Sequence, residues 1–443
     1  MQARARDGDG GHRAAPLVCV LSWCAAKVPT PTRPVNDASI WQMDDVALRY
    51  LLLGLRLGRH VPGFVASYSG PDELSEAVDG EPLTPPAELH NEAMQLAGIA
   101  AELPRETAVQ RRRASWLAAQ VGAMGALARR VGGEEIGYVD LVEELYDIEL
   151  QLEPDATFET ARRMLDSALP GGEPLRQRLA AHEATALLPP QRVLGMAAEL
   201  SARLRMRTRA QLWLPERESL RFEAAHEVPW TLDARYLGGG SSVIRINLDR
   251  PISLAALVEI AAHEGYPGHH AEASVRDEVL VSAGCAELAL VATLSPQALI
   301  SEGMAVVARE VILTDQEHAL ELRRITRSLD QRLDVEVELM VQRARRLLSP
   351  ALGNAAVALQ RDGEPLRQVR SYLAEVALVG DDRLDEAISR LADPILGTEP
   401  FTHIEGRRLV SEWLEVHGQT HGYARLMAEQ QTPATLRSEL RPL

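Results

Sequence analysis

The hydrophobic positions from residue 41 to about residue 208 recur with helical spacing, and short segments rich in Pro and Gly interrupt them. The first helix ends at the run 60–63 (HVPG), after hydrophobic residues spaced three or four apart at Val46, Tyr50, Leu53 and Leu57. The same spacing predicts helices over about 87–104, 106–131, 136–150, 156–169 and 189–207. We therefore expect an N-terminal helical half over residues 41–208.

The pattern changes between residues 209 and 248, where hydrophobic and polar positions alternate. The segments 210–214, 220–224 and 242–247 read as strands, and three glycines at 238–240 precede the last of them. Helical spacing resumes at Ser253, and one long helix is expected over about 315–349. We expect this helix to lie in the core and not in a coiled coil, because its hydrophobic positions do not keep a seven-residue repeat. The sequence predicts a mainly α fold with a small central β-sheet and a second helical half over 249–443.

The first 40 residues follow neither pattern. They mix Gly, Asp, Arg and Pro around one apolar stretch at 16–26, which is too short to span a membrane. Asp7 and Asp9 precede that stretch, where a secretion signal would carry basic residues. We expect residues 1–40 to be a disordered extension, unless translation begins at Met43, directly before the first helix.

Composition removes several classes of protein. Among the 443 residues Lys27 is the only lysine, which excludes Schiff-base catalysis, a P-loop and a kinase site in the folded body. The formal net charge of −16 argues against a nucleic-acid partner. The three cysteines cannot form a disulfide framework, so we expect a cytoplasmic protein with no membrane association.

The densest chemical motif is the run 261–270 (AAHEGYPGHH), which follows the predicted sheet. In H-E-x-x-H zinc sites two histidines four residues apart share one helical face. His263 and His269 are six apart, which places them about 120° off a common face in a straight helix. Pro267 and Gly268 favour a local bulge that would bring His269 back to the metal, while His270 remains the rival ligand.

A third ligand and a base are needed to complete such a site. Glu302 opens an apolar helix downstream and is the expected third ligand. Glu310, two turns further, could hydrogen-bond to a ligand or serve as an alternative ligand itself. Glu264, beside His263, suits a general base that takes a proton from water. The other His-Glu pairs, at 182–183 and 226–227, are expected to be surface or turn residues.

The run at 263–270 resembles an uncharacterised bacterial family with the signature H-E-x-x-P-G-H-H followed by an E-G-x-A helix. That family is similar in fold to the helical Taq-type zinc carboxypeptidases of the thermolysin-like glutamate-zincin clan. The resemblance continues through 57–64 (LGRHVPGF), 229–230 (PW), 236–239 (YLGG), 246–247 (IN), 354–356 (NAA) and 401–409 (FTHIEGRRL). It implies one metallopeptidase-like domain over 41–443, with a deep cleft between its halves.

The resemblance also implies roles for single residues. His263, His269 and Glu302 would bind one Zn²⁺ per chain, and Glu264 would be the base. Relatives carry a tyrosine where this chain has His403, so His403 is expected to stabilise the oxyanion by donating a hydrogen bond, a role that Tyr236 could share.

Substrate binding is expected at two further places. The strand ending at Asn247 could present an edge to an extended peptide, and Arg407 or Arg408 could bind a substrate carboxylate. The function expected is a zinc-dependent hydrolase acting on a peptide or a small amide. The alternative is a non-catalytic metal-binding or scaffold protein that retains the fold. The substrate, exo- against endo-cleavage and the oligomeric state stay open.

Overall fold

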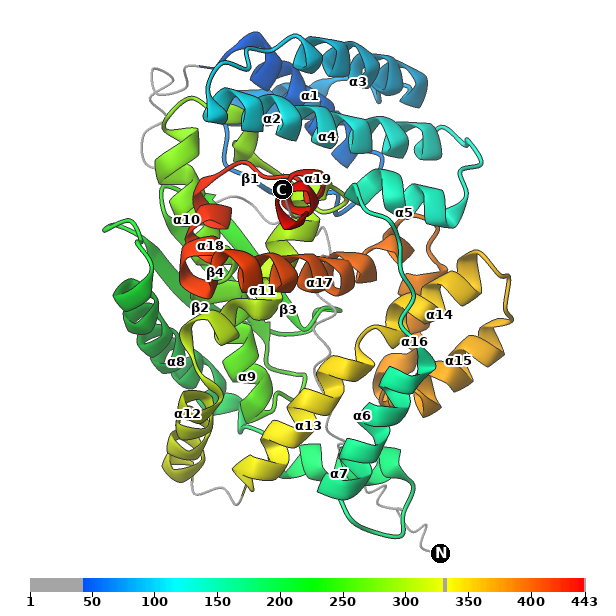
Figure 1. Ribbon diagram of the computed structural model, residues 1–443, viewed down its shortest axis with the longest axis vertical. Helices are drawn as coiled ribbons and strands as arrows, with labels where there is room; N and C mark the ends of the chain where they lie inside the picture. Colours follow the sequence, from blue (N-terminus) through cyan, green and yellow to red (C-terminus); the bar gives the residue numbers. More distant parts are fainter. Residues whose placement is uncertain (1–42, 330–332, 442–443) are drawn as a thin grey trace, which may run out of the picture.

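The computed structural model describes residues 43–329 and 333–441, and the fold over these ranges is mainly helical, as predicted (Figure 1). The disordered extension expected over residues 1–40 lies outside the described residues. Within the described ranges, none of the helices combines the length and the apolar character that a membrane span would need.

The N-terminal half contains helices with one short strand between them. These elements are α1 (Asp45–Gly58), β1 (Val65–Tyr68), α2 (Asp72–Gly80), α3 (Pro86–Ala101), α4 (Ala108–Val131), α5 (Tyr138–Tyr146), α6 (Asp155–Ala168), α7 (Leu175–Thr185) and α8 (Pro190–Gln211). Local sequence sets their first turns: Pro86 occupies the first position of α3, and Thr107 forms a capping box with Gln110 at the start of α4.

The central sheet has three strands, β2 (Ser219–Ala225), β3 (Leu232–Gly238) and β4 (Ser241–Asn247), in the order β2-β4-β3. β4 pairs in parallel with β2 and antiparallel with β3. The predicted edge strand ending at Asn247 is therefore the middle strand, and this prediction is wrong because both sides of β4 are already paired. A separate antiparallel pair joins β1 to β5 (Leu290–Ala292).

The C-terminal half is again helical. Its elements are α9 (Leu254–Ile260), the π-helical turns η2 (Ala261–Gly265) and η3 (Asp277–Val281), α10 (His269–Arg276), the 3₁₀ turns η4 (Ala286–Ala289) and η5 (Leu396–Thr398), α11 (Pro296–Ile312), α12 (Asp315–Ser328), α13 (Val335–Leu348), α14 (Ala351–Gln360), α15 (Leu366–Glu375), α16 (Asp381–Ala392), α17 (Pro400–His417), α18 (Gln419–Ala428) and α19 (Pro433–Leu440).

Two local predictions are wrong. The expected strand at 210–214 is the end of α8 followed by an extended segment, in which Leu212 and Leu214 are buried and Trp213 is exposed. The hydrophobic alternation is present there, but none of the described strands pairs with it. The single long helix expected over 315–349 is two helices, because Asp334 caps the start of α13 by accepting from the backbone N–H groups of Glu336 and Val337.

The helices α11 and α17 form the centre of the molecule (Figure 1). They approach closely where Gly303 faces Gly406, since a Cβ atom on Gly406 would lie 2.2 Å from the carbonyl oxygen of Leu299. The main hydrophobic core draws on both halves of the chain, with Trp116 from α4 and Trp413 from α17 fully buried in it. A smaller core joins α6, α7 and α13.

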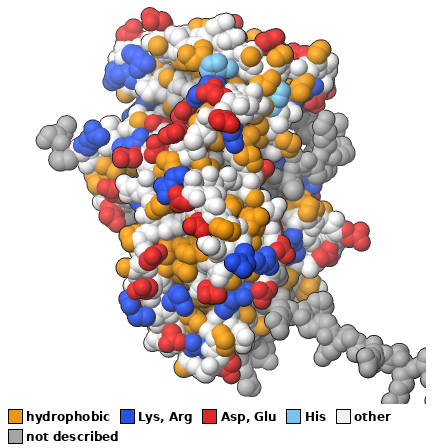
Figure 2. Space-filling model, turned by 90° about the vertical axis from the view of Figure 1, so that its right-hand side faces the viewer, with side chains coloured by type: hydrophobic (Ala, Val, Ile, Leu, Met, Phe, Trp, Pro, Cys, Tyr) orange, Lys and Arg blue, Asp and Glu red, His pale blue; other side chains and the backbone are white. Residues whose placement is uncertain are grey.

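The surface carries a mixture of side chains. On the face drawn in Figure 2, acidic, basic and hydrophobic side chains are interspersed. The net charge of −16 is therefore not gathered into one acidic patch on this face. Many arginines pair with acidic residues, for example Arg56 with Glu81 and Arg49 with Glu92.

Candidate metal centre

The histidine motif lies on an interrupted helix. His263 and Glu264 belong to the π-helical turn η2, which follows α9 directly, and His269 begins α10 after a break at residues 266–268. The backbone N–H of Gly268 donates to the carbonyl of Ala262 at 3.0 Å, and a Cβ atom at Gly268 would lie 1.8 Å from the carbonyl oxygen of His263. Only glycine permits this close turn, and the expected bulge between the two histidines is confirmed.

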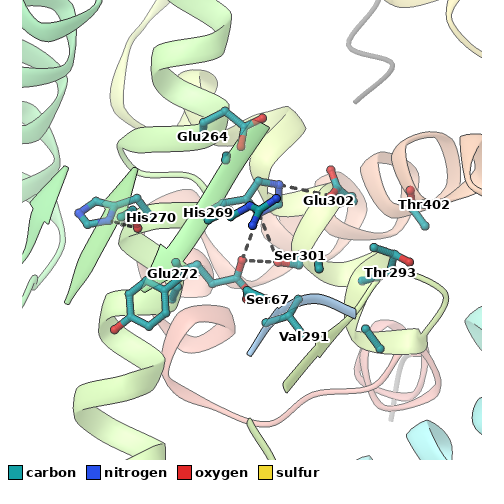
Figure 3. Close-up of a pocket in the computed structure, with 18 of the residues that line it drawn as sticks. Ser67, Glu264, His269, His270, Glu272, Val291, Thr293, Ser301, Glu302 and Thr402 are labelled. Carbon is teal, nitrogen blue, oxygen red and sulfur yellow. Dashed lines mark hydrogen bonds and ion pairs between the residues drawn. The ribbon is translucent and has the colours of Figure 1, made fainter. Parts of the chain in front are cut away.

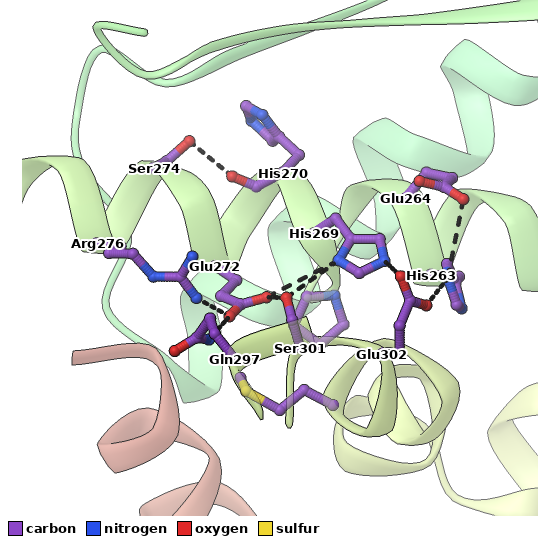
Figure 4. A network of polar contacts seen from close by, with 12 residues as sticks. His263, Glu264, His269, His270, Glu272, Ser274, Arg276, Gln297, Ser301 and Glu302 are labelled. Carbon is purple, nitrogen blue, oxygen red and sulfur yellow. Dashed lines mark hydrogen bonds and ion pairs between the residues drawn. The ribbon is translucent and has the colours of Figure 1, made fainter. Parts of the chain in front are cut away.

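Side chains from three separate segments meet beside this turn. The Nε2 atom of His263 lies 3.3 Å from Oε2 of Glu302, and Nε2 of His269 lies 3.4 Å from Oε1 of the same carboxylate (Figure 4). His403, on α17, places its Nε2 atom 3.1 Å from Oε2 of Glu302. Glu264 Oε1 is 3.8 Å from His263 Nε2.

These ligand atoms lack hydrogen bonds although they are close to one another. Nε2 of His263, His269 and His403 and Oε2 of Glu302 are all buried, and none finds a hydrogen-bond partner among the residues described. Ligands held about 2.1 Å from a tetrahedral metal lie about 3.4 Å apart, which is close to the separations found here. Imidazole and carboxylate are ligands of Zn²⁺. The donor set and its geometry therefore fit a metal ion.

Two overlapping groups can be recognised at this centre. Within each group the ligand atoms all lie within 4.8 Å of one another. One consists of His263, Glu302 and His403, and the other of His263, Glu264 and His269. His403 thus shares a group with two of the predicted ligands, His263 and Glu302, while the third, His269, falls in the group with Glu264.

Burial and charge set the protonation of the centre. Burial raises the pKa of Glu264 above its ordinary value, against the opposing effect of His263 and His269. Burial would also raise the pKa of Glu302, but the nearby imidazoles of His269, His403 and His263 hold it well below its ordinary value. Burial lowers the pKa of His403 to about 4. Burial would lower the pKa of His269 as well, but the carboxylates of Glu302 and Glu272 raise it well above its ordinary value.

His269 is held from its other side by residues that the sequence did not single out. Its Nδ1 atom lies 3.8 Å from the buried carboxylate of Glu272 and 3.5 Å from the hydroxyl of Ser301, which itself donates to Glu272 (Figure 4). Arg276 pairs with the same carboxylate. Such partners fix the orientation of a ligating imidazole. The signal was available, because Glu272 lies one helical turn after His269 and Ser301 directly precedes Glu302.

His270 points away from this centre (Figure 4). Its Nδ1 atom lies 2.7 Å from the hydroxyl of Ser242 on β4, and its Nε2 atom lies 3.2 Å from Glu218, whose side chain is fully buried. Burial would raise the pKa of Glu218, but hydrogen bonds from His270, from Tyr266 and from two arginines lower it to about 2. The structure thus places His270 in a network that anchors α10 to the sheet.

The remaining candidates lie around the centre and are engaged elsewhere. The hydroxyl of Tyr236 donates to Asp277 at 2.5 Å and accepts from the N–H of Gly240 at 2.8 Å. Asn247 is buried and its amide donates to the carbonyls at positions 228 and 230. Glu310 pairs with Arg407 at 3.2 Å. The structure therefore brings none of these four side chains into the group of ligand atoms.

A pocket opens beside the centre. Glu264, His269 and Glu302 contribute to its wall (Figure 3). His403 lines the same pocket. Residues 234–236 of the edge strand β3 and residues of the β1–β5 pair also line it. A second pocket, lined by His263, Glu310 and Arg407 among others, is also lined by His403. The ligand group therefore lies where two pockets approach each other.

Comparisons with known proteins give a fold and no function. No family model matches the chain, and no curated protein matches it. One solved structure, a "putative lipoprotein" from Colwellia psychrerythraea, superposes with a TM-score of 0.52 at 14% identity, over 80% of this chain and 66% of the other, just under two thirds of its length. A second, a "putative lipoprotein of unknown function" from Shewanella oneidensis, gives 0.48 at 13% identity, over 89% and 73%.

The expected cytoplasmic location is contradicted by this comparison. The neighbour from Colwellia psychrerythraea is described as a "putative lipoprotein", and lipoproteins are anchored to a membrane by lipid. The expectation came from the cysteine count and from the acidic residues that precede the apolar stretch at 16–26, and a chain with few cysteines fits either side of a membrane. We therefore withdraw it.

Proposed function

We propose that the protein is a zinc-dependent hydrolase whose substrate is a peptide or a small amide. The observation that carries the proposal is the convergence of four buried ligand atoms without hydrogen-bond partners, from His263, His269, Glu302 and His403, beside the carboxylate of Glu264. The resemblance to the H-E-x-x-P-G-H-H family, and through it to helical zinc carboxypeptidases, supports the same reaction class.

Zinc bound by His263, His269 and Glu302 would supply a Lewis acid and would make water acidic enough to lose a proton near neutral pH. Glu264 would accept a proton from water and return it to the leaving amine. Its buried position suits this role, because burial raises the pKa of Glu264 and so brings its proton affinity closer to that needed at neutral pH. Glu272 and Ser301 keep the His269 ring in one orientation.

The substrate is proposed to lie in the pocket beside β3. β3 is an edge strand, and its residues 234–236 face the pocket that contains Glu264 and Glu302. An extended peptide could pair with such an edge. Two expected contacts receive less support, since the amide of Asn247 holds a turn and Arg407 pairs with Glu310.

The test is a metal analysis combined with a peptide-library digest. We expect about one zinc per chain and cleavage that stops when a chelator removes the metal. Glu264→Gln should keep the zinc and lose the cleavage, while Glu415→Gln, at an exposed position on α17, should change neither. Zinc without any metal-dependent cleavage would favour the scaffold alternative, and absence of zinc from the intact protein would refute the proposal.

A further inference from the structure

We propose that His403 is a fourth protein ligand of the metal and does not serve as a hydrogen-bond donor to the oxyanion. The inference rests on the proposed metal centre and changes the role that the sequence suggested for this residue. It gives the centre three imidazoles and one carboxylate, from His263, His269, His403 and Glu302.

His403 lies as close to the Glu302 carboxylate as the predicted histidine ligands do. His403 Nε2 lies 3.1 Å from Oε2 of Glu302, nearer to the carboxylate than His263 Nε2 at 3.3 Å or His269 Nε2 at 3.4 Å. The rings of His403 and His263 are nearly parallel, with an angle of 8° between their planes and 5.9 Å between their centroids. Two parallel imidazoles thus direct Nε2 atoms toward the same carboxylate oxygen.

The hydrogen bond of Nδ1 sets the tautomer of His403. The hydroxyl of Thr402 donates to the carbonyl of Glu399 at 2.8 Å, so its hydrogen is already engaged. The Nδ1 atom of His403 lies 3.1 Å from that hydroxyl oxygen, which can therefore only accept. His403 must then carry its hydrogen on Nδ1, and Nε2 presents a lone pair. An oxyanion donor would need the hydrogen on Nε2.

Position and tautomer together leave two buried acceptor atoms facing each other. A lone pair on Nε2 of His403 faces a carboxylate oxygen of Glu302 at 3.1 Å, and neither atom has a hydrogen-bond partner among the described residues. Two buried acceptors at this separation repel each other unless a cation lies between them. A metal ion satisfies both atoms at once, whereas an oxyanion would add a third negative group.

The consequence for the reaction is a more closed centre. Three protein ligands would leave a zinc ion room for water or substrate, and a fourth from His403 would reduce that room. The sequence departure at His403, where relatives carry a tyrosine, would then mark a difference in coordination and not a replaced donor.

Spectroscopy of the wild-type protein tests this directly. X-ray absorption at the zinc edge counts the imidazoles on the metal, and we expect three, whereas an oxyanion role for His403 predicts two. This measurement needs neither a variant nor an active enzyme. Two imidazoles on the wild-type zinc would overturn the inference.

Variants give a second, independent readout in the zinc dissociation constant, measured by chelator competition. His403→Gln should weaken zinc binding by at least about 100-fold, beyond the 10- to 100-fold cost of losing an outer partner. Thr402→Val, which removes the partner of Nδ1, should weaken it by about tenfold. His417→Gln, on the same helix, should leave it unchanged. Glutamine keeps a hydrogen-bond donor, so unchanged zinc affinity in His403→Gln would support the oxyanion role.

The outcomes separate this inference from the proposed hydrolase. Three imidazoles without peptide cleavage would support the fourth ligand and refute the hydrolase. Two imidazoles with cleavage that depends on Glu264 would do the opposite. If His403→Gln fails to fold, the wild-type spectrum still decides between the two roles.

Discussion

The crossing of α11 and α17 gives the sharpest prediction, because it fixes two ligands at once. Glu302 directly precedes Gly303 on α11, and His403 lies one turn before Gly406 on α17. A Cβ atom on Gly406 would lie 2.2 Å from the carbonyl oxygen of Leu299 and 2.9 Å from the N–H nitrogen of Gly303. Real Cβ contacts essentially never fall below 3.0 Å, so in Gly406→Ala the helices must separate by about 1 Å.

Overpacking of this kind costs about 1–3 kcal/mol in the free energy of unfolding. Ligand distances tolerate only about 0.2 Å, so a shift of α17 should also weaken zinc binding by at least about tenfold. We expect Gly406→Ala to lower the melting temperature by a few degrees in a thermal scan, and to raise the zinc dissociation constant measured by chelator competition.

A matched control is available on α8. Gly195 is exposed within that helix, and a Cβ atom there would meet nothing within 4 Å. Gly195→Ala should therefore stabilise the protein by about 0.5–1 kcal/mol and leave zinc affinity unchanged. If Gly406→Ala melted no lower than Gly195→Ala and bound zinc equally well, the backbones of α11 and α17 could not be in contact.

Further predictions concern the surroundings of the centre. Glu272→Gln should weaken zinc binding by about 10- to 100-fold in a competition titration, because it removes the carboxylate beside Nδ1 of His269. Gly268→Ala should abolish zinc binding in the same assay, because its Cβ atom would lie 1.8 Å from the carbonyl oxygen of His263. Glu218, with a pKa lowered from 4.5 to about 2, should stabilise the fold by about 3 kcal/mol above pH 4.5 and lose this as the pH falls toward 2. Acid unfolding of Glu218→Gln, followed by circular dichroism, should lack that component. Free zinc at a thousand times its dissociation constant should raise the unfolding free energy of the wild type by about 4 kcal/mol. Removing the zinc should lose that stabilisation.

Features encoded within one segment were the ones that the sequence predicted. The motif at 263–270 contains its own evidence for a bulge, since Pro267 and Gly268 are adjacent to the histidines, and the helix carrying Glu302 has a clear apolar face. Most helices were predicted for the same reason. Strand β4 was found, but its middle position was not, because strand order depends on residues that pair across the fold.

Features that depend on distant segments could not be predicted. The β1–β5 pair joins residue 65 to residue 292, and each strand is too short to alternate visibly. The alternation at 210–214 correctly reported the burial of Leu212 and Leu214, but a strand also needs a partner. His403 was selected only through a resemblance, and its distance from Glu302 depends on a helix crossing that no local pattern records.

The ligands span the chain from residue 263 to residue 403, and this has a consequence for the folded protein as a whole. Among the described residues the one cysteine, Cys285, is free, so no disulfide crosslinks this part of the chain. A metal held at both ends of the span would act as that crosslink. Closing a loop of more than 100 residues lowers the entropy of the unfolded chain, which in the chain-entropy account adds roughly 4–5 kcal/mol to the free energy of unfolding. Protease attack through global unfolding would then be limited by release of the ion.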